Sequence, residues 1–250
     1  MTRIFKIIRL FGHVITGFYL YIRYFYRTNP ELQGFSSHQL ALIKQWFDHI
    51  LNILNIKVIS SLNMATDKPK IYVSNHISWL DIIVIGHILS LRFIAKSEIA
   101  NWPMISRLAA KSGTIFIRRG KISDLTKISQ RVKQVMSLNE SVAFFPEGKT
   151  SEGHSILPIY SGLFQVAIDT GANVIPLILS YDDGCYPAKK LPFVGEQSFM
   201  ANVWAVTGVK RIKVYLDCGQ EISPESKTRK VIANEVSQKM SAVLLKRFAS

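Results

Sequence analysis

The order of short apolar runs and longer helical patterns after residue 55 is the feature that most constrains the fold. Runs rich in Val, Ile and Phe have the length of strands at 56–60, 71–74, 92–95, 114–117, 142–145, 174–179 and 211–216. Apolar residues recur at helical spacing at 78–89, 98–111, 121–138, 160–171 and 232–244. Strands that alternate with helices predict an α/β fold, a mostly parallel sheet flanked by helices.

Residues 4–26 form a second distinctive segment, which is almost wholly apolar and aromatic. Its longest uncharged stretch, 10–22, is 13 residues long, whereas a helix needs about 20 to cross a bilayer. A helix lying in the membrane interface fits this composition best, and a true span or an ordinary buried helix are the alternatives. We expect residues 1–54 to form amphipathic membrane-binding helices and residues 55–250 to form the α/β domain. The segment is broken by Lys6, Arg9, His13 and Arg23.

Composition points to an anionic partner. The chain has 31 basic and 17 acidic residues, a net charge of +14, together with 48% hydrophobic residues. High positive charge combined with high hydrophobicity favours a lipid surface over nucleic acid, for which no recognition module is present. No metal-binding motif or Rossmann glycine fingerprint occurs, so the sequence predicts neither a metal nor a redox cofactor.

A histidine and an aspartate follow the strand at 71–74, in the segment NHISWLD. On a continuous helix, His76 and Asp81 would be separated by about 140°. They can meet only if His76 lies in the turn before a helix and Asp81 lies in its first turns. A carboxylate on one ring nitrogen would leave the other nitrogen free to act as a general base. Taken alone, the spacing also fits a capping histidine beside a solvated aspartate.

Three further segments place this pair in a larger pattern. The segments NHISWLD, GTIFIRRG, FFPEGKTS and VIPLIL occur in that order over residues 75–179. This succession resembles the motif blocks of the 1-acylglycerol-3-phosphate acyltransferase family over about residues 70–180. The first block is the most specific, because it supplies four motif residues together: Asn75, His76, Ser78 and Asp81.

The resemblance implies acyl transfer from a thioester of coenzyme A or acyl carrier protein to the hydroxyl of a lysolipid. His76 would take the proton of that hydroxyl, and Asp81 would orient His76. The thioester would be a co-substrate, and no other cofactor is implied. Ser78 lies inside the motif and is expected to cap the following helix.

The same resemblance suggests residues for substrate binding. Glu147 would bind the acyl acceptor, and Gly148 would allow the backbone to approach it. The turn at Pro146 to Gly148 is also expected to supply backbone amides to the oxyanion. Arg119 keeps the arginine that ends the second block and would bind a phosphate.

Two positions depart from the family pattern. Arg118 replaces an aspartate and would bind the head group or lie in solvent. Lys149 replaces a threonine, while Thr150 stands where the family has an arginine. Nearby, residues 92–133 contain ten basic and two acidic residues, which would face acidic lipids, acyl carrier protein or solvent.

The favoured function is therefore acylation of 1-acylglycerol-3-phosphate to phosphatidic acid. Acylation of a lyso-ornithine lipid or another lysophospholipid is the alternative. A third hypothesis is that the protein is a non-catalytic membrane-binding module. The implied partners are a lipid bilayer, a lysolipid acceptor and the acyl thioester. The implied location is the cytoplasmic face of a bacterial inner membrane.

Overall fold

The computed structural model describes residues 2–30, 33–62, 68–97, 103–117 and 122–249. Arg118 and Arg119 lie outside these ranges, so the phosphate site expected there stays a prediction.

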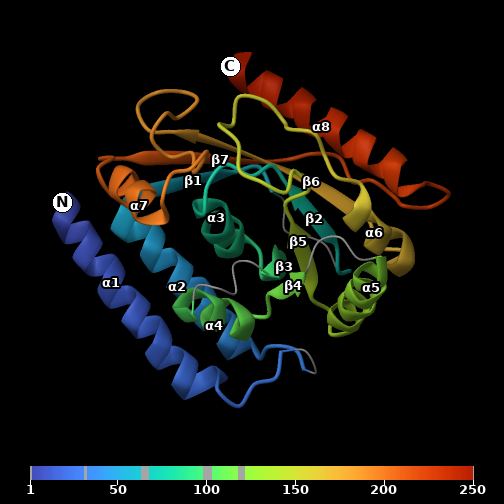
Figure 1. The fold of residues 1–250 in the computed structure, drawn as a ribbon, viewed down its shortest axis with the longest axis horizontal. Helices are drawn as coiled ribbons and strands as arrows, with labels where there is room; N and C mark the ends of the chain where they lie inside the picture. The colour runs from blue at the N-terminus through green and yellow to red at the C-terminus, as the bar shows by residue number, and fades with distance from the viewer. Residues whose placement is uncertain (1, 31–32, 63–67, 98–102, 118–121, 250) are drawn as a thin grey trace.

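The centre of the molecule is a seven-stranded sheet in the order β1-β7-β6-β2-β5-β3-β4 (Figure 1). Neighbouring strands are parallel except β6 and β7, which pair antiparallel. The mostly parallel sheet expected from the sequence is confirmed. The strands are β1 (Ile56–Ser60), β2 (Ile71–Ser74), β3 (Leu91–Lys96), β4 (Ile115–Ile117), β5 (Ser141–Phe144), β6 (Val174–Asp182) and β7 (Ile212–Cys218).

Helices cover both faces of the sheet, as Figure 1 shows for α3 and α8 on opposite sides. Alternate residues of each strand enter two separate cores, because successive side chains point to opposite faces. Tyr72 of β2 joins the core under α2, α3 and α7, whereas Ile71 and Val73 join the core under α5, α6 and α8. The helices that follow the first strand are α3 (Leu80–Ile88), α4 (Pro103–Lys111), α5 (Ile122–Ser137), α6 (Gln165–Thr170), α7 (Phe199–Thr207) and α8 (Arg229–Ala249).

The pattern at 160–171 gives less helix than expected. It forms a short 3₁₀ helix, η3 (Gly162–Phe164), followed by α6. Gly171 ends α6 with a φ of +68°, a conformation that glycine adopts without strain.

The N-terminal segment is helical from Arg3 onward. Helix α1 (Arg3–Leu20) continues into a π-helical turn, η1 (Tyr21–Phe25), and α2 (Ser37–Leu54) follows. A capping box begins α2, in which Ser36 and Gln39 each bond the other's backbone N–H.

Polar contacts fix α1 to the rest of the molecule. The Lys6 side chain is 2% exposed and donates to the carbonyls of Leu54 and Val209, at 3.1 and 2.6 Å. Both carbonyls lie at the ends of helices, where a cation is favoured. Further along α1, the His13 ring hydrogen-bonds the Trp46 carbonyl at 2.9 Å, and the Trp46 indole donates to the His13 carbonyl. Helix α1 therefore runs along the surface of the α/β domain.

Candidate active site

The turn between β2 and α3 brings His76 and Asp81 together. Strand β2 ends at Ser74, the next residues are irregular, and α3 begins at Leu80. His76 Nδ1 and Asp81 Oδ2 are 2.7 Å apart. This is the geometry predicted from the spacing, with His76 before the helix and Asp81 in its first turn.

Asp81 is fully buried and accepts four hydrogen bonds. Its Oδ2 accepts from His76 Nδ1 and from the backbone amides of Ile77 and Ser78, at 2.7 and 3.0 Å. Its Oδ1 accepts from the Tyr181 hydroxyl at 2.6 Å. A buried carboxylate is costly unless donors satisfy it, and here they also fix its orientation.

The His76 ring is held on its flat face as well as at Nδ1. It stacks on Phe145, with ring centroids 4.0 Å apart and an interplanar angle of 15°. Phe145 in turn lies nearly parallel to Phe93. Because Nδ1–H donates to Asp81, Nε2 is the ring nitrogen with a lone pair. The His76 side chain keeps 21% of its surface exposed, so a substrate can reach the ring.

Asn75 anchors the start of this turn to the neighbouring strand. Its side-chain nitrogen donates to the Leu179 carbonyl at 2.9 Å, and its side-chain oxygen accepts from the Leu179 amide at 2.8 Å. The amide thus replaces a ladder rung where the β2–β6 pairing ends, and it holds the loop before His76.

Two other loops also hold the turn. The Ser151 amide donates to the His76 carbonyl at 2.7 Å, and the Ser151 hydroxyl contacts the same oxygen at 3.2 Å. The Phe193 amide donates to the Ile77 carbonyl at 2.9 Å. The position of His76 therefore depends on residues far away in the sequence.

The expected role of Ser78 is wrong. The N-cap of α3 is Trp79, and no side chain caps the helix. Ser78 is buried, and its hydroxyl oxygen has no hydrogen-bond partner among the described residues. Asp81 instead accepts the backbone amides of Ile77 and Ser78, which precede the helix, so the residue that orients His76 also holds the loop before α3.

Glu147 lies in the turn after β5 and is 1% exposed. Within the described residues, neither carboxylate oxygen has a well-oriented hydrogen-bond partner. Burial, and then the nearby charge of Asp81, raise the pKa of Glu147 to about 8, although the backbone near Leu157 and His76 lowers it somewhat. The carboxyl group is therefore mostly protonated at neutral pH. In this conformation it lies beneath the surface, beside the catalytic turn.

The rest of that turn is already hydrogen-bonded. Gly148 has a φ of +67°, and its amide donates to the Phe145 carbonyl at 3.1 Å. The sequence predicted that this turn supplies backbone amides to the oxyanion. The Gly148 amide is instead used by a hydrogen bond within the turn. Pro146 is buried, and its carbonyl accepts from the Tyr160 amide at 3.0 Å.

A cavity of about 570 Å³ opens beside the catalytic turn. Lys149 is exposed there, and Glu152 Oε2 and His154 Nε2 are 3.8 Å apart. The Thr150 hydroxyl points elsewhere, because it bonds the Phe193 carbonyl. The cavity is lined by Lys149, Thr150, Ser151, Glu152, Gly153, His154, Ser155, Leu157, Val194 and Gly195.

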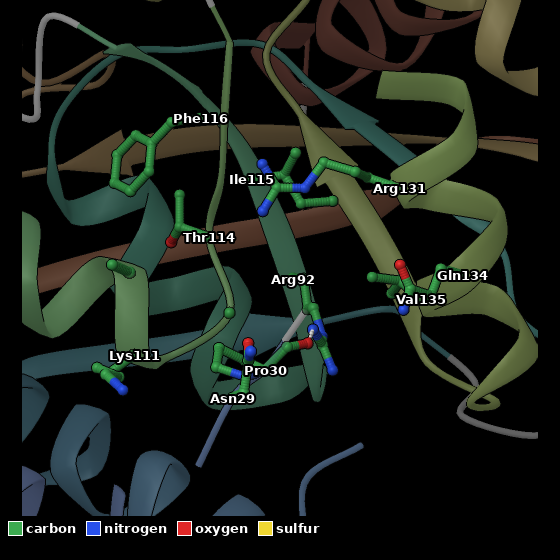
Figure 2. A pocket seen from close by; sticks show the side chains of 12 residues that line it. Asn29, Pro30, Arg92, Lys111, Thr114, Ile115, Phe116, Arg131, Gln134 and Val135 are labelled. Carbon is green, nitrogen blue, oxygen red and sulfur yellow. Dashed lines mark hydrogen bonds between the residues drawn. The ribbon is translucent and has the colours of Figure 1, made fainter. Parts of the chain in front are cut away.

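A second cavity, of about 230 Å³, lies at the amino ends of β3 and β4, away from His76 (Figure 2). Two of its basic side chains serve structure. Arg92 is 2% exposed and bonds Glu140 and the Pro30 carbonyl. Lys111 donates to the carbonyls of Tyr26 and Thr28. Arg92 therefore does not belong to the basic surface expected over residues 92–133.

Comparison with known proteins decides the family. An acyltransferase family model matches residues 55–180. A 1-acyl-sn-glycerol-3-phosphate acyltransferase from Neisseria gonorrhoeae is 32% identical over 173 residues, 68% of each chain. A lyso-ornithine lipid O-acyltransferase from Pseudomonas aeruginosa is 30% identical over 203 residues, 81% of this chain and 78% of its own. The chain belongs to the acyltransferase family.

The fold of this acyltransferase also matches a solved structure. The crystal structure of the 1-acyl-sn-glycerophosphate (LPA) acyltransferase, PlsC, from Thermotoga maritima superposes with a TM-score of 0.66. The match covers 98% of both chains at 18% sequence identity, so it supports the fold alone.

Tyr181 is the residue near the site that the sequence did not reveal. The predicted strand stopped at residue 179, whereas β6 extends to Asp182. Continuing the alternation from Leu177 and Leu179 by one step would have placed Tyr181 on the same face as the catalytic turn.

Proposed function

We propose that this acyltransferase transfers a fatty acyl group from a thioester to the hydroxyl of 1-acylglycerol-3-phosphate, which gives phosphatidic acid. The observation that carries the proposal is the His76–Asp81 pair at a strand end, in which the His76 side chain keeps 21% of its surface exposed. The name of the Neisseria relative supports the choice of acceptor.

In the proposed reaction, His76 Nε2 takes the proton of the lysolipid hydroxyl as its oxygen attacks the thioester carbonyl. The new C–O bond forms a tetrahedral intermediate, and the C–S bond then breaks. The thiolate leaves and receives the proton from the imidazolium. Asp81 keeps Nδ1–H in place and stabilises the imidazolium while it exists. The acceptor hydroxyl is the nucleophile, so no serine nucleophile is required.

The acceptor's phosphate is assigned to Arg119 and Lys149. An arginine fork and an ammonium both suit a phosphate group. Lys149 lines the cavity beside the catalytic turn, whereas Arg119 lies outside the described residues and is assigned from the family resemblance alone. The donor, a thioester of coenzyme A or acyl carrier protein, is proposed from the family resemblance.

One observation favours the second candidate acceptor, a lyso-ornithine lipid. The cavity beside the turn contains the Glu152 carboxylate as well as the Lys149 ammonium. An ornithine head group carries both an ammonium and a carboxylate, so each could meet an opposite charge. The Pseudomonas relative bears this activity in its name.

An acceptor panel separates the two candidates. Purified protein is supplied with one acyl donor and with lysophosphatidate, lyso-ornithine lipid or an uncharged monoacylglycerol. We expect lysophosphatidate to be preferred, and we expect Arg119→Ala and Lys149→Ala each to weaken its use by about 10- to 150-fold, the loss of one charge-assisted bond. Lys246→Ala on the far helix α8 serves as the control. A wild-type preference for lyso-ornithine lipid would overturn the phosphate assignment.

We further propose that the protein binds the membrane through α1 lying in the interface, at the cytoplasmic face. The helix is long and apolar enough to span a bilayer. Only 17% of its most apolar stretch is buried against the rest of the protein. Its inner face is fixed to the domain by Lys6 and His13. A helix packed along a domain in this way cannot cross the bilayer unless those contacts break. Large apolar side chains are exposed along one stripe of the helix: Ile4, Ile8, Phe11, Ile15, Tyr19 and Ile22.

A further inference from the structure

Tyr181 lies directly behind the catalytic pair, although its position falls outside the motif blocks. Its side chain is 1% exposed and packs in the core formed with α3. Its hydroxyl donates to Asp81 Oδ1 at 2.6 Å, whereas the other three donors to Asp81 use Oδ2. The two carboxylate oxygens of Asp81 are therefore held by different parts of the chain.

We propose that Tyr181 is a positioning residue for acyl transfer, which acts on His76 through Asp81. The inference rests on the proposed roles of His76 and Asp81. The donors to Oδ2 all come from residues 76–78, within the catalytic turn itself. Tyr181 ties the same carboxylate to β6, in the centre of the sheet. The hydroxyl thus fixes the plane of the carboxylate, and with it the direction of the Nδ1 bond.

The hydroxyl can serve as a donor throughout the pH range of the reaction. Burial and the negative charge of Asp81 raise the pKa of Tyr181 further above its ordinary value, so the phenol keeps its proton. The Asp81 carboxylate can only accept hydrogen bonds. The protonated Tyr181 hydroxyl is therefore the donor in this pair. The bond also draws negative charge away from the side of Asp81 that faces His76.

Tyr181→Phe removes the hydroxyl and keeps the ring. We expect kcat to fall about 10-fold, the loss of one hydrogen bond to a charged group, while KM for both substrates stays unchanged. The acid-side midpoint of the pH–rate profile should move to higher pH, because an Asp81 that has lost a donor favours protonation of the pair. A residue that only filled space would leave this profile where it was.

Tyr186→Phe is the matched control. Tyr186 follows the same strand, and its hydroxyl contacts Ser180 at 3.1 Å rather than Asp81. The same chemical change there should leave kcat and the pH profile unaltered. Circular dichroism and thermal melting of both variants show whether the fold is kept, and the assays are run well below either melting temperature.

A double-mutant cycle tests the route through Asp81. If Tyr181 acts through Asp81, then Tyr181→Phe should cause no further loss in an Asp81→Asn background. A full additional loss there, or a Tyr181→Phe enzyme that behaves like Tyr186→Phe, would overturn the inference. Normal turnover in His76→Ala would instead overturn the proposed function, so the two failures can be told apart.

Discussion

The catalytic turn and helix α1 depart from the usual distribution of side chains in opposite directions. The turn buries the Asp81 carboxylate, while α1 exposes a stripe of large apolar side chains. Globular proteins normally avoid both, because buried charge and contiguous exposed apolar surface each cost free energy. In the turn the cost is offset by hydrogen bonds within the chain. On α1 the chain offers no such compensation in the described residues, so the compensating surface has to come from outside.

The contrast extends to what holds each region in place. Asp81 is fixed by four donors, and a single change there disturbs a connected network. Helix α1 is held by a few separate contacts, chiefly those of Lys6 and His13. We therefore expect point changes to affect chemistry in the first region and membrane binding in the second, with little crossover.

The largest effect is expected for Asp81→Asn. The amide can present an N–H to His76 and hold the wrong tautomer, and it cannot stabilise the imidazolium. We expect kcat to fall about 10³- to 10⁴-fold, with vesicle binding unchanged. Steady-state acyl transfer and vesicle co-sedimentation check the two halves of this statement. Lost vesicle binding in this variant would break the separation between the regions.

The second effect concerns the stripe on α1. Replacing Phe11 and Ile15 together by glutamate removes two large apolar side chains from the interface and adds charges that anionic lipids repel. Each apolar side chain contributes about 1.5–3 kcal/mol when buried, so vesicle affinity should fall about 100-fold or more. Transfer to a short-chain, water-soluble acceptor should remain near normal.

Leu245→Glu is the matched control for that change. Leu245 is as exposed as Phe11 but lies on α8. We expect it to leave vesicle affinity unchanged. Equal losses in both variants would mean that the protein binds lipid without using α1 in particular.

The third effect is on stability, rather than on rate or membrane binding, and comes from Glu147. The pKa of Glu147 is about 8 in the folded protein, above its ordinary 4.5. The unfolded chain therefore releases this proton where the folded protein keeps it, and the free energy of unfolding falls as pH rises between these values. Titration of Glu147 alone changes the free energy of unfolding by about 1.4 kcal/mol per pH unit. Glu147→Gln should remove this pH dependence and stabilise the protein at neutral pH.

Urea unfolding at a series of pH values between about 5 and 8 measures this slope. Glu152→Gln, at an exposed position in the following loop, is the control and should keep the wild-type slope. An unchanged slope in Glu147→Gln would show that Glu147 is ionised in the folded protein.

Much of the fold followed from the sequence, because the strands of a parallel sheet are covered on both faces. The run 142–145 is apolar throughout and 71–74 is apolar except for Ser74, and all seven expected strands are present. Helix α7 was missed for a physical reason. It exposes Met200 and Trp204 and buries Asn202 and Thr207, so its polarity is inverted and no amphipathic pattern marks it. The antiparallel direction of β7 has no signal in the strand itself.

The catalytic pair could be predicted because both residues lie within one short turn. The spacing of His76 and Asp81 allowed few geometries, and the family motif selected among them. Tyr181 could not be found in the same way, since it meets Asp81 across 100 residues of sequence. The burial of Glu147 depends on loops that no local pattern specifies.

The central claim is that His76 is the base of a direct acyl transfer, and His76→Ala tests it most directly. The measurement is the rate of transfer from an acyl thioester to lysophosphatidate, with circular dichroism and vesicle binding recorded on the same protein. We predict a loss of about 10³- to 10⁴-fold in rate, as in Asp81→Asn, with fold and membrane binding intact. Near-normal turnover by folded, membrane-bound His76→Ala protein would contradict the account.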